Sequence, residues 1–341
     1  MINYMDHIST RKIKIDPSNI SDELINYAAK LLLSGEIVAF PTETVYGLGA
    51  IATDSTAIKK IFKIKNRPLD NPLICHFHSI DHISKYVQQI PDELHALNEK
   101  LWPGPLTVIL FKKNNISSLV TKDLPTIAVR IPSNPIILAL IKKINLPLAA
   151  PSANLSGLPS PTKAEHVISD FKNNLPLVID GGDSKYGMES TVIDLTTTPP
   201  KILRPGAIPF ENIKNILPNI SIQKDNEGPI LSPGMKYKHY SPKTKIIVIN
   251  ESYVKNDQEI EDLAQKIKGK KIILCTNKDH KHSLNTIQLG SNLKTIQTNL
   301  YSSFRELDNL NTEFGIFEGV IDEKEGSAIM NRVKKASFQI L

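Results

Sequence analysis

The chain has 341 residues, too many for one typical domain, and this length favours two. Hydrophobic residues make up 40% and charged residues 22% of the sequence, as in ordinary globular proteins, so each half can bury a core. The formal charge of +6 is a mild basic excess. We interpret it first as a lysine-rich surface and second as a sign of an anionic partner such as a nucleotide or RNA.

The cysteines, the N-terminal residues and the apolar runs of the sequence indicate the cellular compartment of the protein. Cys75 and Cys275 form no CxxC pattern, so the sequence indicates neither a disulfide framework nor a cysteine-rich metal site. The N-terminal residues lack the apolar core of a signal peptide, and no apolar run approaches the roughly 18–20 residues that span a bilayer. We therefore expect a cytoplasmic protein without membrane contact.

Hydrophobic periodicity in the first 208 residues predicts a sheet with flanking helices. Helices are expected at 21–34, from a cap at Asp54 to Pro68, at 92–102 and at 134–144. Strands are expected at 37–40, 73–77, 106–111, 126–131, 148–150, 177–180, 191–195 and 201–203, with a glycine-bearing loop over 45–49. Because strands outnumber helices, a twisted mixed sheet of the α+β type is favoured over a regular βαβ array.

The remainder of the chain divides into a linker and a second α/β domain. From 209 to 243 the periodic pattern gives way to Pro, Asn, Gly and Ser, which indicates a linker. Strands at 245–249, 271–275 and 315–321 then alternate with helices at 257–268, 292–308 and 326–337. This alternation predicts a smaller α/β/α domain, Rossmann-like, with a largely parallel sheet.

The stretch 40–76 is the strongest candidate for a site, because threonine hydroxyls, a glycine-bearing loop, two cations and Asn71 lie close together in it. Lys65 and Arg67 stand where a helix ends before Pro68. They could simply complement the negative end of that helix. The functional alternative is phosphate binding, in which Arg offers a planar fork and Lys a compact point charge.

Three further signals support a polar pocket. Arg130 projects from a strand, and we expect a carboxylate or phosphate partner for it. His76 and His78 alternate on one side of their strand, but no third ligand has suitable spacing, so a hydrogen-bonding histidine is favoured over a metal ligand. Ser152 and Asn154 follow a buried strand, where ordinary turn chemistry would also favour them.

Familiar nucleotide motifs do not fit this sequence. Gly182 and Gly187 have the glycine spacing of a P-loop, but Met188 occupies the lysine position. The pattern Gly47-x-Gly49-x-x-Ala matches the dinucleotide fingerprint, yet no helix is expected to open on it. A nucleotide would therefore bind in a different cradle.

Taken together, these segments resemble the threonylcarbamoyl-AMP synthase family in its two-domain Sua5 form, whose short form is YrdC/TsaC. The matching segments are FPTETVYGLG (40–49), KNRPLDNPL (65–73), LWPGPLTVIL (101–110), AVRIP (128–132), APSANLSG (150–157), ESTVID (189–194), RPGAI (204–208), SPGMKYKHYSP (232–242) and GSAIMNRVKKAS (326–337). They are spread over nearly the whole chain, and only 250–315 is poorly marked.

The resemblance implies an organisation and a reaction. Residues 1–208 would form a YrdC-like catalytic domain, 209–243 a linker and lid over the active site, and 244–341 the Sua5 C-terminal domain. The implied nucleotidyltransferase reaction converts L-threonine, bicarbonate and ATP into threonylcarbamoyl-AMP, diphosphate and water, for t6A37 modification of tRNAs that read ANN codons. Mg2+ would be held mainly by the ATP phosphates, with no metal site on the protein. The product would pass to a threonylcarbamoyl transferase of the TsaD type, with at most a weak contact to tRNA.

The resemblance also implies the site residues. Its threonine side would comprise Thr44, His76, Arg130, Ala150 and Ser190, with Arg130 clamping the substrate carboxylate. Its ATP side would comprise Lys65, Arg67, Asn71, Thr126, Ser152, Asn154, Ser160 and Arg204, with Tyr240 of the linker folding back over the nucleotide. Lys65 and Arg67 are the expected catalytic pair, since they could neutralise charge on the α-phosphate.

Two alternatives stay open at the level of sequence. The first is an RNA-binding module of the same fold, although the chain carries no RNP-like aromatic platform or arginine-rich segment. The second is a carbamoyl-phosphate-using maturation protein, which would carry zinc-finger-like cysteines that two distant cysteines cannot supply.

Overall fold

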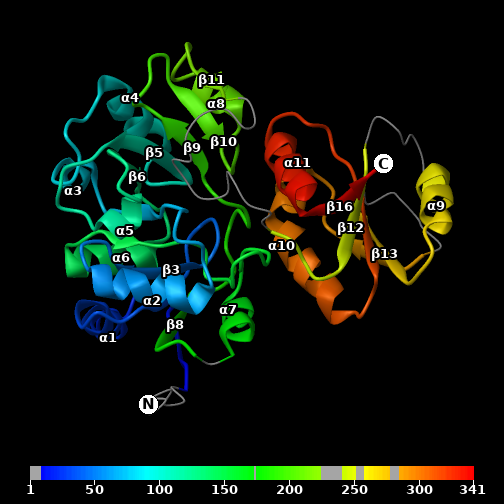
Figure 1. Ribbon diagram of the computed structural model, residues 1–341, viewed down its shortest axis with the longest axis horizontal. Coiled ribbons are helices and arrows are strands. Elements are labelled where there is room, and N and C mark those ends of the chain that lie inside the picture. Colours follow the sequence, from blue (N-terminus) through cyan, green and yellow to red (C-terminus); the bar gives the residue numbers. More distant parts are fainter. Residues whose placement is uncertain (1–8, 173, 224–239, 251–256, 277–283) are drawn as a thin grey trace.

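The computed structural model describes residues 9–172, 174–223, 240–250, 257–276 and 284–341. Figure 1 shows two domains side by side, each built on its own sheet. The sheet of the first domain runs in the order β1 (Arg11–Lys14), β8 (Leu177–Asp180), β2 (Val38–Phe40), β3 (Gly47–Ile51), β7 (Leu148–Ala149), β4 (Ile74–His76), β6 (Thr126–Arg130), β5 (Leu106–Phe111), β9 (Thr191–Asp194), β10 (Lys201–Arg204) and β11 (Ser221–Ile222). Parallel and antiparallel pairs alternate irregularly along it, so the predicted mixed sheet is confirmed.

Helices flank this sheet. They are α1 (Asp22–Leu33), α2 (Ser55–Lys65), α3 (Ile80–Ser84), α4 (Asp92–Leu101), α5 (Ser118–Thr121), α6 (Pro135–Ile144), α7 (Ala164–Phe171) and α8 (Phe210–Lys214). The predicted cap of α2 is confirmed, because the Asp54 carboxylate accepts hydrogen bonds from the backbone of Thr56 and Ala57 at 2.8 and 3.0 Å. At its other end α2 stops at Lys65, since Asn66 adopts the left-handed conformation with φ of 51°.

One expectation, the glycine-bearing loop over 45–49, is wrong for its second half. Residues Gly47–Ile51 form β3, which pairs antiparallel with β2 so that Phe40 lies opposite Gly47. Glycine is depleted in strands, and this masked the strand signal. Position 49 requires glycine for a steric reason, because a Cβ there would come within 2.4 Å of the Phe40 ring.

The linker expected for 209–243 begins later than predicted. Its described part includes α8 and β11, and β11 pairs parallel with β10 at the edge of the first sheet. Residues up to 223 are therefore part of the first domain's fold. Residues 224–239 of the expected linker lie outside the described part of the chain.

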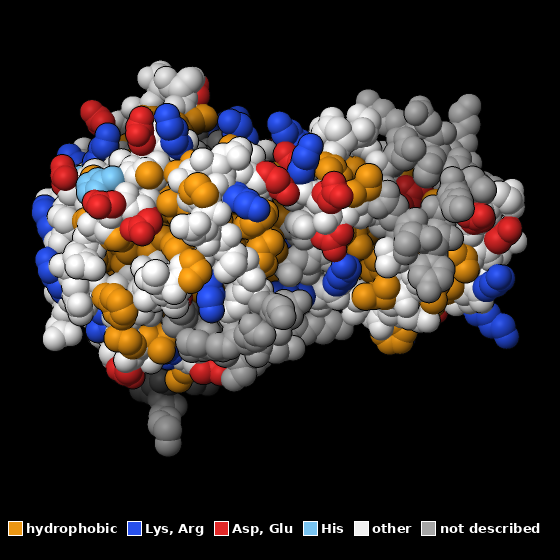
Figure 2. All heavy atoms as spheres, turned by 90° about the horizontal axis from the view of Figure 1, so that it is seen from above, with side chains coloured by type: hydrophobic (Ala, Val, Ile, Leu, Met, Phe, Trp, Pro, Cys, Tyr) orange, Lys and Arg blue, Asp and Glu red, His pale blue; other side chains and the backbone are white. Residues whose placement is uncertain are grey.

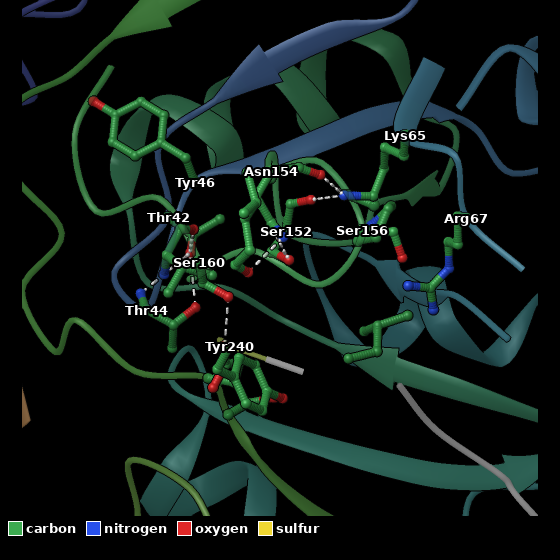
Figure 3. Close-up of a pocket in the computed structure, with 18 of the residues that line it drawn as sticks. Thr42, Thr44, Tyr46, Lys65, Arg67, Ser152, Asn154, Ser156, Ser160 and Tyr240 are labelled. Carbon is green, nitrogen blue, oxygen red and sulfur yellow. Dashed lines mark hydrogen bonds between the residues drawn. The ribbon is translucent and has the colours of Figure 1, made fainter. Parts of the chain in front are cut away.

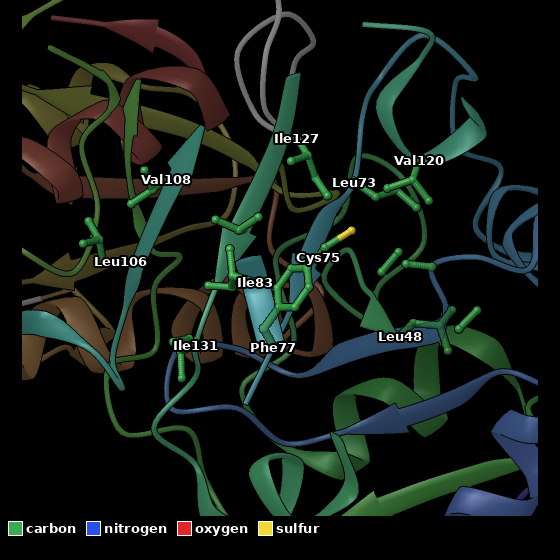
Figure 4. Close-up of a cluster of buried hydrophobic side chains, with 14 of the residues drawn as sticks. Leu48, Leu73, Cys75, Phe77, Ile83, Leu106, Val108, Val120, Ile127 and Ile131 are labelled. Carbon is green, nitrogen blue, oxygen red and sulfur yellow. The ribbon is translucent and has the colours of Figure 1, made fainter. Parts of the chain in front are cut away.

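Both faces of the first sheet are covered by apolar side chains. One cluster contains Leu48, Cys75, Phe77 and Val108, and Figure 4 shows Cys75 and Phe77 lying between Val108 and Leu48. A second cluster, which includes Phe40, joins α1 and α6 to the other face. Double coverage explains why the central strands read as continuous apolar runs rather than as alternating ones.

The C-terminal domain has a five-stranded sheet. Its order is β14 (Thr286–Gln288), β13 (Lys271–Cys275), β15 (Phe314–Glu318), β12 (Lys245–Ile249) and β16 (Ser337–Ile340), and every pair is parallel. Helices α10 (Leu293–Asn309) and α11 (Glu325–Ala336) pack on one face and α9 (Asp257–Lys266) on the other, as Figure 1 shows. The predicted α/β/α domain is confirmed. Strands β1, β3, β11, β14 and β16 and helices α3, α5, α7 and α8 were not predicted.

Helix α10 docks the C-terminal domain against the first domain. Arg305 of α10 forms an ion pair with Asp170 at 2.8 Å, and both side chains are largely buried. Gly187, with φ of 62°, lies against the backbone of Thr298, where a Cβ would approach the carbonyl oxygen within 2.1 Å. The two domains therefore share a close-packed interface rather than a loose contact.

The surface of the molecule carries mixed charge. Figure 2 shows basic and acidic side chains interspersed over one face of both domains. In the described part of the chain, no helix combines the length and the apolar character needed to cross a membrane.

We expect Phe77→Ala to destabilise the protein by about 3–5 kcal/mol, because Phe77 is fully buried and its removal leaves a cavity. Urea unfolding followed by circular dichroism measures this change. Phe111→Ala is the matched control, since Phe111 is 41% exposed. A cost for Phe77→Ala no larger than that of the control would contradict the assignment of this core.

Candidate active site

A pocket opens where β4 and β6 end side by side, next to the β2–β3 hairpin and the turn that follows β7. Of the predicted site residues, those that line it are Thr44, Lys65, Arg67, His76, Arg130, Ala150, Ser152, Asn154, Ser160, Ser190, Arg204 and Tyr240. Figure 3 shows Thr42 and Thr44 at one end, Lys65 and Arg67 at the other, and Tyr240 along one side. The fold thus gathers into one place residues that are widely separated in sequence.

The first end of the pocket is organised around Arg130. The register of β4 on β6 places His76 next to Arg130. The Arg130 guanidinium donates hydrogen bonds to Glu43 Oε1 at 2.7 Å and to Thr44 Oγ1 at 3.0 Å, and both partners are buried. Thr44 and Thr42 share a further hydrogen bond of 2.8 Å between their hydroxyls. This end therefore offers a cation, a carboxylate and hydroxyl groups at close range.

His76 is a neutral group at this end. Burial, reinforced by the charge of Arg130, lowers the pKa of His76 from 6.5 to about 3. Its Nδ1 atom is buried and has no hydrogen-bond partner among the described residues. A ligand hydroxyl or amine would satisfy that atom.

Lys65 lies at the second end and is 1% exposed. Its ammonium donates to the carbonyl oxygen of Ser152 at 2.6 Å and to that of Asn154. Burial, followed by the charge of Arg67, lowers the pKa of Lys65 well below 10.5. Lys65 therefore holds the turn at 152–154 in place as well as lining the pocket.

Arg67 stands beside Lys65 and is also tied to carbonyl groups. Its guanidinium donates to the backbone oxygens of Asn71 at 3.3 Å and of Pro72 at 3.1 Å. Burial lowers its pKa from 12.5 to about 10. Within the described residues, neither Arg67 nor Lys65 forms an ion pair with a carboxylate. A buried lysine and a partly buried arginine thus line the pocket without a direct ion pair to a carboxylate.

The turn after β7 supplies polar groups between the two ends. Ser152 donates to Asn154 Oδ1 at 2.5 Å, and the Asn154 amide donates to the carbonyl oxygens of Leu155 and Leu158. These bonds give the turn a set shape, so the ordinary turn chemistry considered for Ser152 and Asn154 is present together with their place in the pocket.

Asn71 and Thr126 are not part of the pocket lining. The Asn71 carbonyl accepts the hydrogen bond from Arg67, so Asn71 lies next to the Arg67 end. Thr126 begins β6 and pairs with Phe111 of β5. The contact of both residues with ATP stays a prediction.

Comparisons with known proteins agree with this geometry. Residues 30–206 match a family model described as "Telomere recombination", and residues 208–337 match "Threonylcarbamoyl-AMP synthase, C-terminal domain". The threonylcarbamoyl-AMP synthase of Pyrococcus abyssi is 42% identical over 93% of this chain and 95% of the relative. That of Bacillus subtilis is 41% identical over 94% of this chain and 95% of the relative.

A solved structure shows the same architecture. The crystal structure of P. abyssi Sua5 complexed with L-threonine superposes with a TM-score of 0.91 at 40% identity, covering 97% of this chain and 99% of that one. The chain belongs to the two-domain Sua5 threonylcarbamoyl-AMP synthases. The predicted activity, synthesis of threonylcarbamoyl-AMP for the t6A modification of tRNA, is thereby confirmed.

The sequence predictions missed two carboxylates of the synthase site. Glu43 pairs with Arg130, and Glu189 lines the pocket while accepting a 2.7 Å hydrogen bond from Ser160. Both belong to segments that resemble the family, FPTETV and ESTVID, but a carboxylate alone in a polar turn carries no local signal. A search for a buried carboxylate partner for each predicted arginine is the only sequence-level route to them.

The prediction that His76 and His78 share a side of one strand is wrong. His78 follows the end of β4 and stacks on His82, with ring centroids 4.3 Å apart. Only His76 therefore reaches the pocket of the synthase.

The low pKa of His76 predicts a specific acid sensitivity. Unfolded histidine binds a proton near pH 6.5 and folded His76 only near pH 3, so the free energy of unfolding falls as the pH drops through this window. We expect the wild type to lose about 1.4 kcal/mol more per pH unit than His76→Gln between pH 4 and 5.5. Urea unfolding at several pH values measures both slopes. Parallel curves for the two proteins would refute a buried neutral His76, and the exposed His95→Gln variant provides the control.

Proposed function

We propose that the pocket binds L-threonine at the Arg130 end and ATP at the Lys65–Arg67 end, so that the two substrates meet between them. The observation that carries this proposal is the contrast in charge pairing. Arg130 is balanced by Glu43, whereas Lys65 and Arg67 have no carboxylate partner among the described residues. A triphosphate would supply the missing negative charge, and an amino acid would match the mixed polarity of the other end.

The chemistry follows in two steps. The amine of threonine adds to bicarbonate with loss of water, which gives N-carboxy-threonine. An oxygen of this carbamate then attacks the α-phosphorus of ATP, and the bond from the α-phosphorus to the bridging oxygen breaks, so that diphosphate leaves. The protein forms no covalent intermediate in this scheme. Its task is to bring two anions together and to neutralise charge that builds up on the α-phosphate.

Particular side chains serve these tasks. Arg130 would bind the carboxylate of threonine while Glu43 holds its guanidinium in orientation. Thr44, Ala150 and neutral His76 would surround the side chain and amine, with Ser190 nearby. Lys65 and Arg67 remain the proposed catalytic pair, and Ser152, Asn154, Ser160 and Arg204 would contact the nucleotide. Lys65 has the additional role of shaping the 152–154 turn.

Mg2+ would enter with ATP. In the described part of the chain no group of three His, Cys, Asp or Glu side chains is placed to hold a metal ion. The polar side chains of the pocket are mainly cations, hydroxyls and amides, with Glu189 as its one carboxylate among the described residues, which suits an ion carried by phosphate oxygens. Bound in this way, Mg2+ would share in neutralising the phosphate charge.

We also propose a role for the segment around Tyr240 and a fate for the product. Tyr240 lines the pocket and is 7% exposed, which supports a linker that closes over the nucleotide and shields a labile product from water. The product would pass to a threonylcarbamoyl transferase of the TsaD type. The cytoplasmic location expected from the sequence stays a prediction.

Omitting substrates one at a time tests the reaction. Diphosphate release from ATP and Mg2+ should require both L-threonine and bicarbonate, because the carbamate is the attacking group. Enzyme-coupled detection of diphosphate measures this. Release that proceeds at the same rate without threonine would contradict the proposed mechanism.

Exchanging one cation at each end tests the arrangement of the substrates. Arg130→Ala should raise the KM for threonine by about tenfold or more and that for ATP much less, whereas Arg67→Ala should do the reverse, since each loses charge-assisted hydrogen bonds to one substrate. Steady-state kinetics with each substrate varied gives these constants. Lys143→Ala removes an exposed cation of α6 and controls for net charge. Equal effects of Arg130→Ala and Arg67→Ala on both substrates would argue against two separate ends.

A further inference from the structure

The carboxylate of Glu189 joins the pocket to the C-terminal domain. Its Oε1 atom accepts a hydrogen bond from Ser160 at 2.7 Å. Its Oε2 atom accepts one from the Tyr301 hydroxyl of α10 and one from Arg332 Nε of α11, each at 2.9 Å. Two of the three donors therefore come from the C-terminal domain, whereas Glu189 and Ser160 line the pocket of the first domain.

The ion pair between Glu189 and Arg332 is buried. Arg332 is 0% exposed, and Glu189 is its only carboxylate partner in the part of the chain that the structure describes. Burial by itself would raise the pKa of Glu189, but the charges of Arg332 and Arg204 and the hydrogen bonds from Ser160 and Arg332 outweigh it and lower this pKa. Glu189 is thus a carboxylate at neutral pH.

The ionised Glu189 determines whether the Ser160 hydroxyl can donate or accept a hydrogen bond with a ligand. A carboxylate only accepts hydrogen bonds, so the hydroxyl proton of Ser160 is committed to Glu189. The lone pairs of Ser160 Oγ are then left to accept a bond from the ligand. The ATP side of the pocket consequently offers an acceptor here, suited to a ribose hydroxyl or an adenine amine.

The same two residues of the C-terminal domain hold Tyr240. The guanidinium carbon of Arg332 lies 5.4 Å from the centre of the Tyr240 ring, in a cation–π contact. The Tyr301 ring stacks on the Tyr240 ring, with centroids 5.5 Å apart and planes inclined by 24°. Tyr240, which lines the pocket, therefore takes its position from the residues that bind Glu189.

Docking of the two domains has other supports that do not reach the pocket. Arg305 of α10 pairs with Asp170 at 2.8 Å and also donates to the carbonyl oxygen of Pro159. Thr162 and Ser302 share a hydrogen bond of 2.8 Å across the same interface. Arg305, Asp170 and Pro159 are absent from the pocket lining. The contacts of Arg332 and Tyr301 with pocket residues thus go beyond what docking requires.

We propose that Arg332 and Tyr301 are positioning residues for ATP, through which the C-terminal domain completes the nucleotide side of the active site. They act by orienting Ser160 through Glu189 and by holding Tyr240 against the pocket. This inference rests on the proposed placement of ATP at the Lys65–Arg67 end.

The test compares Arg332→Met with Arg305→Met in the full-length chain. Each variant loses one buried ion pair between the domains, and of the two arginines only Arg332 has a hydrogen bond or ring contact with a residue of the pocket lining. We expect Arg332→Met to weaken Mg–ATP binding, measured by calorimetry, about tenfold or more while changing the KM for threonine less than about twofold. Arg305→Met should lower the melting temperature but leave the ATP dissociation constant within about twofold of the wild type. Arg332→Lys, which keeps the charge, should recover part of the affinity.

Equal weakening of ATP binding in the Arg332→Met and Arg305→Met variants would overturn the proposal, because docking alone would then explain the effect. Unchanged ATP binding in Arg332→Met would also overturn it. If Arg332→Met does not fold, Tyr301→Phe decides, since it removes one hydroxyl and keeps the stacked ring. About threefold weaker ATP binding supports the proposal, and an unchanged dissociation constant rejects it. Calorimetry reports on ATP binding alone, so a failure of the proposed reaction in the diphosphate assay would be recognised separately.

Discussion

Positive charge that forms no direct ion pair with a carboxylate, at Lys65 and Arg67, is the constraint on which the proposed nucleotide half of this site depends. Lys65 and Arg67 donate to carbonyl oxygens, and within the described residues neither forms an ion pair with a carboxylate. Burying an unpaired charge is costly, so such a site binds an anion strongly. Arg130 shows the opposite solution, because Glu43 balances it at 2.7 Å. The two ends of one pocket thus differ in how their cations are paired, and this difference supports the proposed placement of one substrate at each end.

The segment between β8 and β9 connects this charge pattern with the docking of the domains. Gly187 lies against the backbone of α10, Glu189 accepts hydrogen bonds from both helices of the interface, and Ser190 lines the pocket. A shift of the C-terminal domain would therefore move groups that face the ligands. On the proposed placement of ATP, the second domain would in this sense contribute to the active site, although most of its residues lie outside the pocket lining.

The features of the fold that could be predicted are those produced by interactions between residues close together in the sequence. Side-chain caps such as Asp54, the clean strands at β5 and β12, and the helix stop before Pro68 all appeared where expected. Strand β3 was missed, because its glycines at 47 and 49 are there to make room for Phe40 rather than to form a turn. Strand β11 was missed, since two residues gain their strand identity only by pairing with β10. Most site residues were found through ordered motifs, and Glu43 and Glu189 were not.

By itself, the sequence determined most of the long helices and buried strands, the presence of two sheet-based domains and the family, since caps, periodicity and ordered motifs are all encoded over short stretches of chain. Only the tertiary structure decided which buried charges are paired. Arg130 meets a carboxylate 87 residues away and Arg332 one 143 residues away. The energy of such a pair depends on separations of a few ångströms and on exclusion of water. Strand register and domain docking set both quantities, and no spacing along the chain expresses them.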